Sequence, residues 1–129
     1  FALGRWVLLF VFPQTQADLS SVYEPRAHAS PWLIAALLLL ITGPAEELFW
    51  RGLIQRVAVD RLGPAAGVGL ASVLYASVHL WTGNGPLILA ALVAGLFWGV
   101  LYLRTGNLWA PVISHALWGV AAFVWFPFA

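Results

Sequence analysis

Apolar residues run along this chain in four long blocks, which are separated by short polar turns. The blocks cover about residues 31–59, 65–81, 87–103 and 108–128, and the turns are rich in glycine, proline and arginine. The apolar runs are continuous and do not alternate with polar residues, which argues against strands and predicts helices. Runs of about 17 to 25 apolar residues match a hydrocarbon core about 30 Å thick. The pattern therefore predicts an all-α bundle that crosses a membrane about four times.

The first thirty residues depart from this pattern. Residues 1–12 form an apolar run that is too short to cross a membrane, and we interpret it as part of a truncated helix. Residues 13–30 form the one long polar stretch and predict a loop. The prediction is thus a single membrane-embedded domain over residues 1–129, with a partial helix at 1–12, a polar loop at 13–30 and core helices at 31–128.

The composition supports a membrane protein and excludes several kinds of chemistry. Of the 129 residues, 62% are hydrophobic and 9% are charged, which leaves too few polar side chains to cover a soluble fold. The net charge of +1 provides no basic field, so no nucleic-acid partner is expected. Because cysteine is absent, disulfides, thiolate nucleophiles and cysteine-bound metals are excluded.

The arginines of the turns predict an orientation. If the blocks cross the membrane in alternate directions, Arg5, Arg56, Arg61 and Arg104 fall on one side and Arg26 on the other. Cytoplasmic loops collect positive charge, so we place the first group in the cytoplasm. The membrane is expected to be that of a bacterial or archaeal cell.

A few ionisable side chains lie within the apolar blocks, where burial of a charge is costly and such residues usually have a function. Three blocks contain them, as Glu46, Glu47 and Arg51 in the first, His79 in the second and His115 in the fourth. Glu47 and Arg51 are four residues apart and are expected to pair on one helix face, which leaves Glu46 without an arginine. If His79 lies within hydrogen-bond reach, Glu46 and His79 can hold and deprotonate a water molecule. His115 can then stabilise the oxyanion that forms.

Simpler interpretations exist for each of these residues taken alone. A glutamate and an arginine four residues apart often form a surface salt bridge, and a lone histidine in a membrane often bonds to a neighbouring helix. Two histidines and a glutamate can also bind zinc, but no His-Glu-x-x-His sequence is present. We therefore expect no required cofactor. A divalent metal such as zinc, held by Glu46, His79 and His115, is the less favoured alternative.

Three motifs resemble those of the CAAX protease and bacteriocin-processing family, which comprises the type II CAAX prenyl endopeptidases and their bacterial relatives and is also called the abortive-infection family. Its Glu-Glu-x-x-x-Arg motif stands complete at residues 46–51. Its Phe-x-x-x-His motif appears at residues 75–79 with Tyr75 in place of phenylalanine, and its His-x-x-x-Asn motif appears at residues 115–119 with Gly119 in place of asparagine. The motifs, in the expected order, extend over about residues 31–120.

The resemblance implies an intramembrane endopeptidase that cleaves a membrane-tethered peptide or protein within the lipid bilayer. The residues that match the motifs take two kinds of role. The catalytic residues would be Glu46, Glu47, His79 and His115. The supporting residues would be Arg51 and Tyr75. Members of the family were long described as metalloproteases, although a mechanism in which glutamate and histidine activate water needs no metal.

The glycine at position 119 leaves alternatives open. Asparagine there would donate a hydrogen bond to the oxyanion, and loss of one such donor costs about 100-fold to 1000-fold in rate. The alternative function is a membrane immunity or scaffold protein of the same fold with weakened catalysis. A third hypothesis is a proton-coupled transporter with Glu46 and His79 as a relay, but four spans without a pair of broken-helix repeats fit a transporter poorly.

Overall fold

The computed structural model describes residue 10 and residues 20–125, and the regular elements of that part are all helical. The first core helix runs without a break over the 32 residues Pro31–Leu62, with a mean hydropathy of 1.6. Along the chain its segments are α3 (Pro31–Leu37), η2 (Leu38–Thr42), α4 (Gly43–Phe49), η3 (Trp50–Gln55) and α5 (Arg56–Leu62). Pro31 occupies the first turn, where its missing N–H is not needed.

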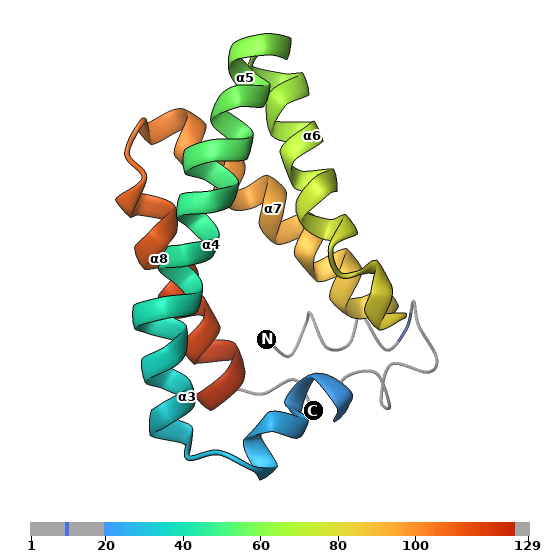
Figure 1. Ribbon diagram of the computed structural model, residues 1–129, viewed down its shortest axis with the longest axis vertical. Helices are drawn as coiled ribbons and strands as arrows, with labels where there is room; N and C mark the ends of the chain where they lie inside the picture. Colours follow the sequence, from blue (N-terminus) through green and yellow to red (C-terminus); the bar gives the residue numbers. More distant parts are fainter. Residues whose placement is uncertain (1–9, 11–19, 126–129) are drawn as a thin grey trace.

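Three more helical segments complete the bundle (Figure 1). They are made up of α6 (Pro64–Ser77) with η4 (Leu80–Thr82), α7 (Gly85–Thr105), and α8 (Trp109–Val120) with η5 (Ala121–Trp125). Within the described residues, three helices are long and apolar enough to cross a membrane, and the last segment, Trp109–Trp125, is apolar but shorter. The predicted all-α membrane bundle is therefore confirmed, and of the four predicted core spans three reach full length and the last is shorter.

Close helix packing depends on small residues. Gly63 begins the α5–α6 hairpin with a φ of 82°, and a Cβ on Gly67 would lie 2.5 Å from the backbone of Val59. A Cβ on Gly95 would lie 3.2 Å from Ser72, where α7 packs against α6. Small residues at Gly67 and Gly95 let these helices approach closely. A Cβ on Gly69, in contrast, would meet nothing within 4 Å.

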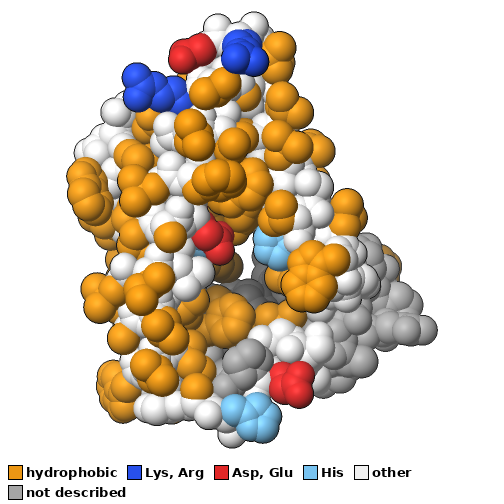
Figure 2. All heavy atoms as spheres, in the orientation of Figure 1, with side chains coloured by type: hydrophobic (Ala, Val, Ile, Leu, Met, Phe, Trp, Pro, Cys, Tyr) orange, Lys and Arg blue, Asp and Glu red, His pale blue; other side chains and the backbone are white. Residues whose placement is uncertain are grey.

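Large polar side chains lie buried inside the bundle, and its exterior is apolar. The largest fully buried side chains include Arg51, Gln55 and Glu47, whereas Leu40 and Trp81 are 75% and 86% exposed. Figure 2 shows hydrophobic side chains over most of the visible surface of the helices. A lipid environment accounts for both features, since apolar surface is stable there and polar groups must be satisfied inside the protein. The chain is an integral membrane protein.

Two π-helical segments, η2 and η3, lie on either side of α4. The N–H of Gly43 donates to the carbonyl oxygen of Leu38, five residues earlier, at the end of η2. Such wider turns are rare and occur often at functional sites, because they rotate the residues that follow them relative to a regular helix. The sequence predicts one regular helix here, and the structure differs at these two places.

The polar loop predicted at 13–30 is partly helical. Residues 20–23 are helical and lead into η1 (Glu24–Ala27). The Tyr23 hydroxyl donates to the carbonyl oxygen of Ala122 at 3.1 Å, and the Tyr23 ring packs on Phe123 at 5.2 Å. The structure thus differs from the predicted loop over residues 20–27, where Tyr23 contacts η5. Residues 11–19 and most of the partial helix predicted at 1–12 lie outside the described residues.

Basic side chains gather at the end of the bundle where α5 meets α6 (Figure 2). Arg56 and Asp60 line the same shallow cleft as Tyr102 and Gly106, so the end of α5 and the end of α7 lie on one side. The helix η1, which contains Arg26, lies toward the opposite end (Figure 1). The assignment of the first side to the cytoplasm stays a prediction.

Candidate active site

Glu47 and Arg51 form the expected pair, and they form it in the interior of the protein. The Arg51 Nη1 atom donates to Glu47 Oε1 at 3.0 Å, and the two side chains are 2% and 0% exposed. The Arg51 Nη2 atom also donates to the carbonyl oxygen of Gly95 on α7 at 3.1 Å. The guanidinium lies 5.0 Å from the ring centre of Tyr75 and 5.7 Å from that of Trp98. This pair therefore joins three helices and is not a surface salt bridge.

His115 reaches the same buried carboxylate from α8. Its Nδ1 atom lies 2.7 Å from Glu47 Oε1, and because a carboxylate accepts, Nδ1 carries the hydrogen. Its ring stacks on Trp98 with centres 3.8 Å apart and planes 18° apart. Trp98 in turn donates from Nε1 to Ser114 Oγ at 3.2 Å. Trp98 thus fixes the His115 ring, a role that sequence reasoning missed. The sequence signal for this role was the position of Trp98 in the middle of a span, away from the membrane surface where tryptophans usually lie.

Gly43 allows α8 to lie this close to α4. A Cβ on Gly43 would lie 3.0 Å from the Cα of Ala116, the residue that follows His115. The side chain of any other residue would push α8 away from the helix that carries Glu47.

We expect Gly43→Val to destabilise the protein by about 1–3 kcal/mol, because the added carbons overfill this contact. Unfolding measured in detergent micelles checks the value. Gly69→Ala is the matched control, since its Cβ meets nothing within 4 Å and alanine favours the helix. Equal stability of the two variants would contradict the close contact.

Glu46 is the more accessible of the two carboxylates. Its side chain is 33% exposed, and its Oε2 atom accepts a hydrogen bond from the Tyr75 hydroxyl at 2.8 Å. The His115 Nε2 atom lies 4.0 Å from the same oxygen. Glu46 therefore lies beside the buried network of Glu47 and Arg51 and retains room for another molecule.

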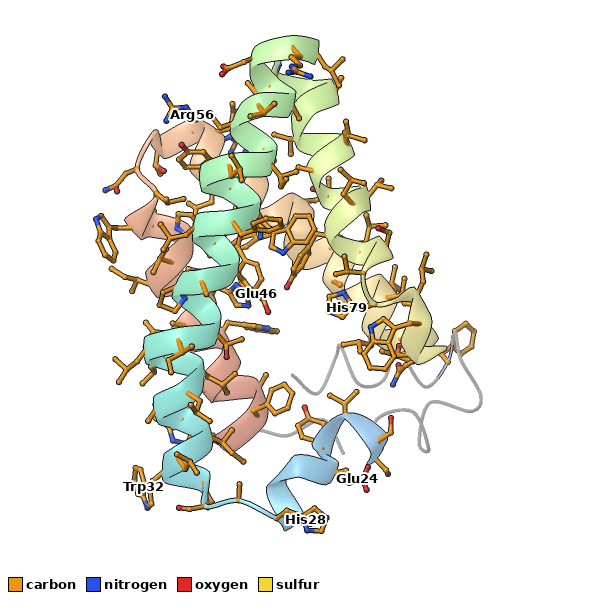
Figure 3. All side chains as sticks on the ribbon, viewed as in Figure 1. Glu24, His28, Trp32, Glu46, Arg56 and His79 are labelled. Carbon is orange, nitrogen blue, oxygen red and sulfur yellow. The ribbon has the colours of Figure 1, made fainter. Side chains whose placement is uncertain are left out.

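His79 lies across from Glu46, at the end of α6. Figure 3 shows the two side chains at the same level of the bundle, on opposite sides of the space between α4 and α6, and the space-filling view shows a hollow there. The His79 Nδ1 atom donates to the carbonyl oxygen of Tyr75 at 3.1 Å, which leaves Nε2 of the neutral ring with a lone pair. Within residues 20–125 no hydrogen bond joins Glu46 and His79 directly, so a water or substrate atom must lie between them if they act together.

The donors named for a metal site do not form a ligand set in this arrangement. In the described part of the chain, no three histidine, aspartate or glutamate side chains lie close enough together to hold a metal ion. A catalytic zinc needs about three such ligands at about 2 Å.

Gly119 lies one turn beyond His115 on α8. A Cβ there would meet Leu38 at 3.7 Å, an ordinary van der Waals distance, so the position accepts a Cβ without a clash. The structure thus brings Glu46, Glu47, Arg51, Tyr75 and His115 together and places His79 across the hollow, while position 119 supplies no donor. The catalytic roles of these residues stay predictions.

Comparison with known protein families shows which family this chain belongs to. A family model described as "Type II CAAX prenyl endopeptidase Rce1-like" matches residues 28–121, which include all three motifs. This chain belongs to that family. No solved structure matches the chain significantly.

The chain also resembles curated proteins with a different description. It is 34% identical over 95 residues to the "Probable 4-amino-4-deoxy-L-arabinose-phosphoundecaprenol flippase subunit ArnE" of Aeromonas salmonicida, a match that covers 64% of this chain and 81% of that protein. The protein of the same name from Aeromonas hydrophila matches with the same identity and coverage. The family is that of the endopeptidases, and the resemblance to flippase subunits supplies a second activity to test.

Proposed function

We propose that this chain is an intramembrane endopeptidase that hydrolyses a peptide bond in a membrane-tethered peptide or protein. One observation carries the proposal, namely that the two adjacent carboxylates differ in burial and in hydrogen bonding. Glu47 is fully buried and bonded to Arg51 and His115, whereas Glu46 is 33% exposed and faces a hollow with His79 on its other side. A base that must accept a proton from water needs this combination of access and fixed position.

The reaction starts with a water molecule held between Glu46 and the Nε2 lone pair of His79. Glu46 takes a proton from the water as the oxygen forms a bond to the carbonyl carbon, and the electron pair of the C=O bond moves onto the carbonyl oxygen. When the C–N bond breaks, Glu46 returns the proton to the leaving nitrogen.

His115 supports this reaction from α8. Its Nδ1 hydrogen is already donated to Glu47, so Nε2 carries a hydrogen only when the ring is protonated. A protonated His115 then offers Nε2–H to the oxyanion, close to the oxygen of Glu46.

The resemblance to flippase subunits supports a second candidate function, the movement of a lipid-linked group across the membrane. The weakened immunity or scaffold protein is the non-catalytic alternative. In both cases the Glu46 carboxylate would have no hydrolytic role.

Purified protein in proteoliposomes distinguishes these functions. We would offer it a panel of lipid-anchored peptides, with fragments read by mass spectrometry, and in parallel an undecaprenyl-phosphate-linked probe whose transbilayer movement is followed. We expect peptide fragments that depend on Glu46 and no added movement of the probe. Movement of the probe without any peptide fragments would favour the flippase function, and neither activity would favour the scaffold.

Metal removal provides a further prediction. Incubation with a chelator such as phenanthroline is expected to leave the hydrolysis rate unchanged, because water activation is assigned to Glu46 and His79 alone. The non-chelating isomer of the same compound is the control. Loss of activity that returns on addition of zinc would instead support a metal held by Glu46, His79 and His115.

A further inference from the structure

The chain departs from the family motifs at two positions, and the two departures change hydrogen-bond donors in opposite directions. Gly119 removes the side-chain amide that asparagine would supply. Tyr75 adds a hydroxyl that phenylalanine lacks. The motifs thus lose one donor group on α8 and gain one on α6.

The Tyr75 hydroxyl is held at the reacting groups. The side chain is 6% exposed, and its ring packs edge-on against Trp50 at 5.4 Å and lies 5.0 Å from the Arg51 guanidinium. Its hydroxyl lies 2.8 Å from Glu46 Oε2, and His115 Nε2 lies 4.0 Å from that same oxygen. The Tyr75 hydroxyl and the His115 Nε2 atom, which come from different helices, thus border the same oxygen of the proposed base.

We propose that the Tyr75 hydroxyl donates a hydrogen bond to the oxyanion, in the role that Gly119 leaves vacant. This inference rests on the proposed endopeptidase function.

The movement of charge during the reaction explains how one hydroxyl can serve both acceptors. Before attack, the negative charge is on Glu46, and the hydroxyl donates to it. Proton transfer from water neutralises Glu46 as the carbonyl oxygen becomes negative. A donor beside both groups then forms a stronger hydrogen bond to the new anion than to the neutral acid. When the C–N bond breaks and Glu46 returns its proton to the leaving nitrogen, the hydroxyl bonds to the carboxylate again.

A purely positioning role for Tyr75 is the competing explanation. In that case the hydroxyl only fixes the orientation of Glu46, and a donor added at position 119 would not compensate for its loss. A Cβ at position 119 meets Leu38 at an ordinary van der Waals distance, so a substitution can begin there without a backbone clash.

The test is a cycle of Tyr75→Phe, Gly119→Asn and the double variant, all as the full chain in proteoliposomes with a tethered peptide that the wild type cleaves. We expect Tyr75→Phe to lower kcat by about 100-fold with little change in KM. Gly119→Asn is expected to recover at least about tenfold of that loss in the double variant and to change the wild type by less. Tyr102→Phe, at the far end of α7, is the matched control, and unfolding in micelles confirms that each variant is folded.

Two results would overturn this inference without contradicting the proposed endopeptidase function. The first is a Tyr75→Phe variant with wild-type kcat while Glu46→Gln is inactive. The second is a loss in Tyr75→Phe that Gly119→Asn does not restore, which assigns Tyr75 to positioning alone. Absence of cleavage by the wild type across the peptide panel would instead refute the proposed function, and this inference with it.

Discussion

Replacing Arg51 with methionine is expected to destabilise the folded protein by about 3–5 kcal/mol, since it leaves a buried carboxylate without its cation. Glu47 is fully buried, and its Oε2 atom already has no hydrogen-bond partner among the residues that the structure describes. The variant also loses the hydrogen bond from Arg51 to the carbonyl oxygen of Gly95, which joins the first core helix to α7. Reversible unfolding in detergent micelles measures the loss.

Two controls separate the loss of charge pairing from the loss of bulk. Adding Glu47→Gln to Arg51→Met removes the unpaired charge and is expected to restore part of the stability. Arg56→Met changes the same residue type at an exposed position of the same helix and is expected to have little effect. If Arg51→Met were as stable as Arg56→Met, the buried network would not hold the fold together.

Glu46→Gln is expected to lower the hydrolysis rate by about 10²-fold to 10⁴-fold, the contribution typical of a general base. Glutamine has the same shape and can still accept the hydrogen bond from Tyr75, but it cannot take a proton from water. The unfolding midpoint should therefore change little, since Glu46 is 33% exposed and not paired with Arg51.

Glu24→Gln is the matched control for this variant, because Glu24 is an exposed carboxylate in η1. It is expected to cleave at the wild-type rate. A Glu46→Gln protein that is folded and hydrolyses peptides as fast as Glu24→Gln would exclude Glu46 as the base.

Much of the fold follows from local features of the sequence. The four apolar blocks match the helical segments, and the turns at Gly63 and Gly83 lie where breaks were predicted, because both residues adopt positive φ angles. The Glu47–Arg51 pair was predictable from a spacing of four residues on one helix.

The rest depends on contacts between distant parts of the chain. His115 and Glu47 are 68 positions apart, and only the packing of α8 on α4 brings Nδ1 to the carboxylate. The stacking of Trp98 on His115 and the hydroxyl of Tyr75 on Glu46 likewise join different helices. Hydrophobic periodicity shows which residues are apolar and not which neighbours they contact, so only the motifs and the mid-span position of Trp98 pointed toward these contacts.

The most direct measurement compares protein termini across the membrane proteome of a host that lacks the gene and is complemented with either the wild type or Glu46→Gln at matched expression. The account predicts new termini that appear only with the wild type and come from membrane-tethered proteins. Identical termini in the two strains, with both proteins folded in the membrane, would contradict an endopeptidase that depends on Glu46.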